Sequence, residues 1–191
     1  MPEIIEVAMD ECEFTSDTDT DLVTYGVSTC IAFIIYASFY DEDDDLIQSR
    51  GLYHWSGFEV KQKDPAKSIN DTLSFFLDEL RMHFDLPFEL DIQIDSLFFI
   101  GGEHAVWEND DLILSGTERE VYYLTEAVRD YNYSGAHFSK PKHINHSHFL
   151  TSGNESLTIK ASSNQCSYET NTSDNCSKEE ENQWEQSQYT I

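Results

Sequence analysis

The sequence predicts an α+β fold in which a mixed, largely antiparallel β-sheet core is flanked by two amphipathic helices. Two runs of β-branched, aromatic and other apolar residues lie on either side of the acidic segment 41–45, as expected for a long β-hairpin. Two later segments carry apolar residues at helical spacing. With 191 residues, of which 39% are hydrophobic, the chain can build one domain with a core of its own.

The first elements can be predicted from local pattern. Residues 1–21 are expected to form an N-terminal segment, with a short apolar stretch that runs into a solvated, acidic loop. Residues 22–58 are expected to form the hairpin with its charged tip. Asp64 provides an N-cap and Pro65 suits the first helical position, so an amphipathic helix is expected from there to about Phe84.

A buried strand is expected next, because apolar residues alternate from Leu90 to Ile100 before Gly101-Gly102. Residues 112–114 are a further short strand candidate. The segment Thr117-Glu-Arg-Glu120 has the pattern of a capping box, which predicts a second amphipathic helix that ends near Gly135.

Two last apolar segments, 146–150 and 156–160, flank a Ser-Gly-Asn turn and predict a closing hairpin. The domain is therefore expected to span residues 22–160. Residues 161–191 are polar, acidic and poor in apolar residues, so they are expected to be a disordered tail.

Charge and hydropathy exclude several classes of function. The 37 acidic and 11 basic residues give a formal charge of -26, which would repel nucleic acids and anionic membranes. The N-terminus lacks the basic and then apolar pattern of a secretory signal. The longest apolar run, 30–40, is shorter than the roughly 20 residues that a membrane-spanning helix needs. We therefore expect a cytoplasmic protein without membrane insertion or nucleic acid partners.

The cysteines and histidines do not predict a metal centre. The cysteines have no metal-ligand spacing, and without an export signal they are expected to be reduced thiols: Cys12, Cys30, Cys166 and Cys176. A second group could suit zinc or nickel only if it met further ligands, which no nearby carboxylate or thiolate provides: His137, His143, His146 and His148. No metal and no cofactor are expected.

The hairpin brings a thiol and an imidazole together. If its tip is centred on Asp43, then Cys30 lies opposite a position near 56, and His54 lies two residues from that position on the same face. A neighbouring imidazole can take the proton of a thiol that is mostly protonated at neutral pH. The pair Cys30 and His54 therefore predicts acyl transfer chemistry, and the alternative is a buried core cysteine beside a structural histidine.

The segment Thr24-Tyr-Gly-Val-Ser-Thr-Cys30 resembles the Thr-x-Gly-x-Gly-Ser-Cys signature of the CheD family, the chemoreceptor glutamine deamidases. The later elements are similar to that family in order: a strand, a return strand with Gly-Leu-Tyr-His54, a long helix, and a strand that ends in Phe-Phe-Ile-Gly-Gly. The resemblance covers residues 22–160. The chain departs from it at Ser28, where the family usually has glycine, at the longer acidic tip, and in the segment 137–142.

This resemblance implies a fold of the CheD and cytotoxic-necrotizing-factor type and a catalytic triad. It implies that Cys30 is the nucleophile, that His54 is the general base and acid, and that Thr24 orients the imidazole. The backbone N–H groups of Ser28 and Thr29 are candidates for the oxyanion hole. The implied reaction is hydrolysis of a protein glutamine side chain to glutamate through a thioester, with a chemoreceptor-like or host protein as the substrate.

Three alternatives stay open at this point. The same pair could serve a transglutaminase or a cysteine protease, which use an amine acceptor or a peptide bond. The fold could instead be a non-catalytic module whose acidic surface binds a basic protein. Finally, the tail segment KEEENQWEQSQ resembles the glutamate-rich C-terminal signals of some bacterial effectors, which would make a translocated protein that acts on a host substrate.

Overall fold

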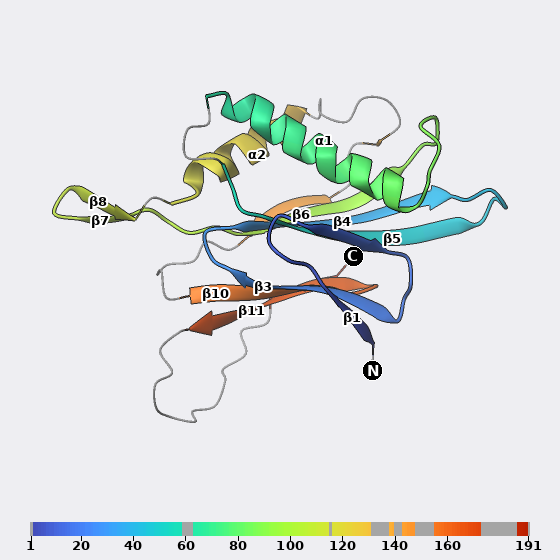
Figure 1. The fold of residues 1–191 in the computed structure, drawn as a ribbon, viewed down its shortest axis with the longest axis horizontal. Helices are drawn as coiled ribbons and strands as arrows, with labels where there is room; N and C mark the ends of the chain where they lie inside the picture. The colour runs from blue at the N-terminus through green and yellow to red at the C-terminus, as the bar shows by residue number, and fades with distance from the viewer. Residues whose placement is uncertain are drawn as a thin grey trace.

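The computed structural model describes residues 2–58, 63–114, 116–130, 138–139, 143–147, 155–172 and 187–190. These residues form three layers, with two helices on one side of a middle sheet and an outer sheet on the other side (Figure 1). The pairings are mostly antiparallel. The predicted α+β class with two helices and mostly antiparallel sheets is confirmed.

The middle sheet is built around the predicted hairpin. Its strands, in spatial order, are β2 (Cys12–Thr15), β5 (Leu46–Trp55), β4 (Ile31–Tyr40), β6 (Gln93–Gly101) and β9 (His143–Ser147). The hairpin register runs from Ile31 opposite Trp55 to Tyr40 opposite Leu46, which confirms the predicted centre of the tip. β4 is a continuous apolar run because both of its faces are buried, one against the helices and one against the outer sheet.

The helices cover one face of the middle sheet. α1 (Pro65–His83) begins as predicted, with the Asp64 side chain accepting a hydrogen bond from the backbone N–H of Lys67. Apolar residues from the helices pack with the odd-numbered residues of β4: Ile69, Leu73, Phe76, Leu77 and Leu80 of α1, and Leu124 and Val128 of α2 (Glu118–Asp130). Burial of these side chains stabilises the fold by about 25 cal/mol per Å² of apolar area removed from water.

The outer sheet departs from the sequence-based expectations. Its strands, in spatial order, are β1 (Glu3–Glu6), β3 (Thr20–Val27), β10 (Glu155–Ala161), β11 (Gln165–Thr172) and β12 (Ser187–Thr190). The first run of the predicted hairpin is therefore two strands: the chain leaves the outer sheet at Val27 and enters the middle sheet at Ile31. Gly26, at φ 69°, lies at this crossing.

The expected closing hairpin is wrong. β9 pairs in parallel with β6 of the middle sheet, whereas β10 pairs with β3 and β11 of the outer sheet. Residues 148–154, which include His148, lie outside the described residues. In the outer sheet, the apolar residues of β10 pack against the even-numbered residues of β4.

Two further boundaries differ from expectation. Residues 165–172, expected to belong to a disordered tail, form β11, whose Cys166 is fully buried between the sheets. The expected N-terminal segment 1–21 is not separate from the domain, because its strands β1 and β2 each extend one of the two sheets. The short strand expected at residues 112–114 is confirmed: it is β8 (Asp111–Leu114), which pairs with β7 (Val106–Glu108) in a separate projecting hairpin (Figure 1).

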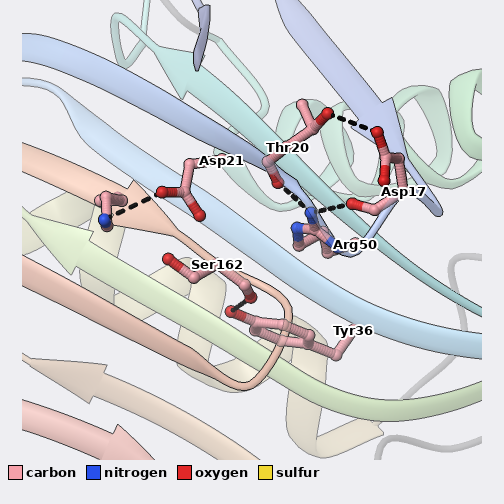
Figure 2. Close-up of polar contacts among 7 residues, drawn as sticks. Asp17, Thr20, Asp21, Tyr36, Arg50 and Ser162 are labelled. Atoms are coloured by element: carbon pink, nitrogen blue, oxygen red, sulfur yellow. Dashed lines mark hydrogen bonds and ion pairs between the residues drawn. The ribbon is translucent and has the colours of Figure 1, made fainter. Parts of the chain in front are cut away.

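A polar network joins the sheets at the end away from Cys30. Figure 2 shows the Arg50 guanidinium donating to the backbone carbonyls of Asp17 and Thr20, while the Tyr36 hydroxyl donates to the carbonyl of Ser162 over 2.9 Å. Arg50 is buried, so these carbonyls compensate for the loss of its hydration. The network ties the loop before β3 to the middle sheet.

Candidate active site

Three predicted site residues are buried between the two sheets, where Thr24 bonds to His54 and Cys30 lies on the same sheet face as His54. Thr24 lies in β3, Cys30 in the short link between β3 and β4, and His54 near the end of β5. His54 pairs with Ala32, so its side chain shares a sheet face with that of Cys30, as the hairpin geometry predicted. All three are buried, with exposed fractions of 0%, 8% and 3% for Thr24, Cys30 and His54.

The hydrogen bonds of Thr24 determine the protonation of the imidazole. Its Oγ1 lies 2.8 Å from the carbonyl oxygen of Val7 and 2.8 Å from Nδ1 of His54. A carbonyl can only accept, so the single hydroxyl proton goes to Val7 and the hydroxyl oxygen accepts from Nδ1–H. In the neutral ring, Nε2 is then the unprotonated nitrogen and carries the lone pair.

Nε2 of His54 is buried and has no hydrogen-bond partner among the described residues. A buried acceptor without a partner is costly, by about 1–3 kcal/mol, and such an exception in a native structure can mark a catalytic role. The histidine is thus held by its Nδ1 side, and its basic nitrogen is available to take a proton.

Both members of the pair are neutral in the resting site. Burial raises the pKa of the Cys30 thiol, hydrogen bonding by the Thr29 side chain lowers it, and the charge of Asp10 raises it again. Burial also lowers the pKa of His54 below its ordinary value near 6.5. A neutral thiol beside a neutral imidazole suits general-base activation, in which the proton moves as the thiol attacks.

The turn at residues 28–30, which carries the thiol, is fixed by its neighbours at the end of β6. The backbone N–H of Gly102 donates to the carbonyl of Cys30 over 2.8 Å. Gly101 has φ +117°, and a Cβ there would lie 2.7 Å from the same carbonyl. Glycine at position 101 is thus required for close packing against this turn. Hydrogen bonding by the Ser28 backbone, like that by the Thr29 side chain, acts on the thiol and lowers its pKa.

The sequence analysis missed the N-terminal contribution to the site. Met9 pairs with His54 through an isolated parallel bridge, and its Sδ lies 4.0 Å from Sγ of Cys30. The backbone N–H of Asp10 donates to the carbonyl of His54 over 2.6 Å, and the backbone N–H of His54 donates to the carbonyl of Glu11 over 3.1 Å. No motif marks this contact, because it joins residues that are far apart in the sequence.

Glu103 is a second residue that the sequence analysis missed. It comes directly after the glycine pair and is only 2% exposed, and its Oε1 has no hydrogen-bond partner within the described part of the chain. Burial and the nearby charge of Glu118 raise the pKa of its carboxyl. Its backbone is held by Thr117, whose hydroxyl accepts from the N–H of Glu103 over 3.0 Å.

Metal and membrane chemistry find no support in the described residues. None of the groups of His, Cys, Asp and Glu in these ranges is arranged to hold a metal ion. Of the expected histidine cluster, His143 and His146 lie in β9, whereas His137 and His148 lie outside the described residues. No helix in the described ranges is long and apolar enough to cross a membrane.

The chain matches no protein-family model, and a search among curated proteins finds no relative.

Proposed function

We propose that this protein is a cysteine hydrolase that deamidates glutamine side chains of another protein. The observation that carries the proposal is the Thr24–His54 hydrogen bond, which leaves the basic Nε2 without a described partner on the sheet face that it shares with Cys30. A nucleophile, a base and a third group that orients the base are the parts that acyl transfer requires.

In the proposed cycle, Nε2 of His54 takes the thiol proton while Sγ of Cys30 attacks the glutamine carboxamide carbon. The C–N bond breaks, and ammonia leaves with the proton that His54 returns. His54 then takes a proton from water, whose oxygen attacks the thioester carbon. The C–S bond breaks, and the proton returns to the thiolate, so that glutamate and the original site result.

The turn at residues 28–30 is the proposed location of the oxyanion hole. The carbonyl of Cys30 accepts from the backbone N–H of Gly102, which fixes the turn whose backbone N–H groups would face the developing oxyanion. Cys30 and His54 lie at the end of the middle sheet at which β4 begins and β5 ends. The net charge of -26 favours a substrate glutamine that lies within a basic protein surface.

Thiol reactivity tests the proposal first. Limiting iodoacetamide near pH 7, followed by mass spectrometry of the intact protein and its peptides, compares Cys30 with the buried Cys166 as an internal standard. We expect Cys30 to react first, and we expect its rate to fall about tenfold in His54→Ala. Burial raises the pKa of Cys166 to about 12, so its labelling reports only on unfolding.

Product formation tests the reaction itself. Incubation with denatured casein should release ammonia and convert glutamine to glutamate, a gain of about one dalton per site, and Cys30→Ser should abolish both. Cross-linking to added amines would favour a transglutaminase. A Cys30 whose labelling is slow and indifferent to His54 would contradict the enzyme and favour the acidic binding module.

A further inference from the structure

Met9 lies directly against the thiol. The Cys30 thiol donates weakly to Sδ of Met9 across 4.0 Å, a distance of van der Waals contact. Because Met9 and His54 are bridge partners, their side chains share one face of the sheet, and Cys30 shares that face too. Met9 is 59% exposed and Cys30 is only 8% exposed, so Met9 lies on the solvent side of the thiol that it contacts.

The shape of methionine gives this contact a chemical meaning. Methionine and glutamine have unbranched side chains, with two methylene groups before the third heavy atom. In methionine that atom is Sδ, and in glutamine it is the carboxamide carbon. The atom of Met9 that touches the thiol is therefore the counterpart of the glutamine atom that the thiol would attack, which must come within about 3–3.5 Å for reaction.

Hydrogen bonds on both sides of Met9 hold its backbone next to the thiol. On one side, the carbonyl of Val7 accepts from the Thr24 hydroxyl that also orients His54. On the other side, Asp10 and Glu11 bond to the backbone of His54. Asp10 has φ 63°, which is uncommon for a residue other than glycine, so the chain turns sharply there. The tether fixes the backbone, while the exposed side chain can rotate away at small cost.

We propose that the Met9 side chain fills the subsite for the substrate's glutamine side chain, as a built-in substrate mimic that the substrate must displace. This inference rests on the proposed function and adds how the substrate enters. A glutamine side chain approaches along the path of the Met9 side chain, between the segment 7–11 and the turn at residues 28–30. The subsite accepts an unbranched side chain, and asparagine is too short to reach the thiol from the same backbone position.

The first experiment converts the mimic into a substrate. In the full-length protein, Met9→Gln should gain about one dalton on the peptide that contains position 9, because the introduced carboxamide lies at the thiol. The gain should be absent when Cys30→Ser is added. Met82→Gln is the matched control, since Met82 is also exposed, at 62%, but lies on α1 away from the site. It should gain nothing.

The second experiment removes the cover. Met9→Ala should speed the reaction of Cys30 with iodoacetamide about threefold or more, whereas Met82→Ala should leave the rate unchanged. Unchanged labelling in Met9→Ala would overturn the inference. So would an unconverted glutamine at position 9 in a protein that deamidates casein.

These outcomes separate the inference from the proposed function. If Cys30 labelling depends on His54 but not on Met9, the hydrolase stands and the subsite is wrong. If labelling is indifferent to His54, the hydrolase fails, and conversion of the introduced glutamine is not expected in any variant.

Discussion

Replacement of Thr24 by valine tests the tautomer argument most directly. Valine has nearly the shape of threonine, so the fully buried position stays filled, but both 2.8 Å hydrogen bonds are lost. The carbonyl of Val7 and Nδ1–H of His54 then lose this partner inside the protein. At about 1–3 kcal/mol for each unsatisfied group, we expect the free energy of unfolding to fall by about 2–6 kcal/mol.

The same change should affect reactivity beyond stability. Without the hydroxyl, the imidazole proton is no longer held on Nδ1, and a proton on Nε2 would block transfer from the thiol. We expect the His54-dependent labelling of Cys30 to fall about tenfold under conditions where the protein is folded. Nitrogen NMR of labelled histidine reports the tautomer, and urea denaturation reports the stability.

Thr24→Ser is the matched control for this prediction. It keeps the hydroxyl and removes one buried methyl group, so it should cost about 1 kcal/mol and leave the tautomer unchanged. If Thr24→Val loses less than about 0.5 kcal/mol and keeps the proton on Nδ1, the assigned hydrogen bonds do not orient His54.

The remaining predictions concern pH and backbone geometry. The pKa of His54 is lowered in the folded state, so the unfolded chain binds the proton more readily. The free energy of unfolding should therefore fall as the pH drops below about 6.5, by at most about 1.4 kcal/mol per pH unit. His54→Gln should remove this component in urea titrations between pH 5 and 8. For Glu103 the dependence of stability on pH has the opposite sign. Its raised pKa contributes stability at low pH, which is lost as the pH rises through the pKa of the folded state. Glu103→Gln should therefore raise the melting temperature at pH 7 more than at pH 4. Gly101→Ala should cost about 2–4 kcal/mol of stability, because it combines φ +117° with a Cβ only 2.7 Å from the carbonyl of Cys30. Calorimetry should find a smaller loss of about 1–2 kcal/mol for Gly26→Ala, because Gly26 has φ +69° but open space around it. Equal losses would contradict the packing argument.

Local pattern was sufficient for the parts of the fold that depend on near neighbours. The N-cap of α1 and the register of the β4–β5 hairpin depend on turn residues and on periodicity along a short stretch of chain. The proximity of Cys30 and His54 is a consequence of that register, so it too could be predicted. The contact of Thr24 with His54 could not be derived from local pattern, because it crosses from one sheet to the other.

The pairing of distant strands could not be predicted in the same way. β9 and β10 have the composition of hairpin partners, yet they belong to different sheets, since burial between the two sheets outweighs the short connection between the strands. The strand β11 was missed because its polar sequence carries few apolar residues, although Cys166 packs it against the core.

By itself, the sequence determined which residues form the helices and the central hairpin, and it placed a thiol and an imidazole on one sheet face. Those features depend on interactions within a few tens of residues. Only the tertiary structure decided that Met9 contacts the thiol, that Glu103 is buried next to the glycine pair, and that Thr24 bonds the Nδ1 side of His54. These contacts depend on how the two sheets pack, and packing brings together residues whose separation along the chain carries no local signal.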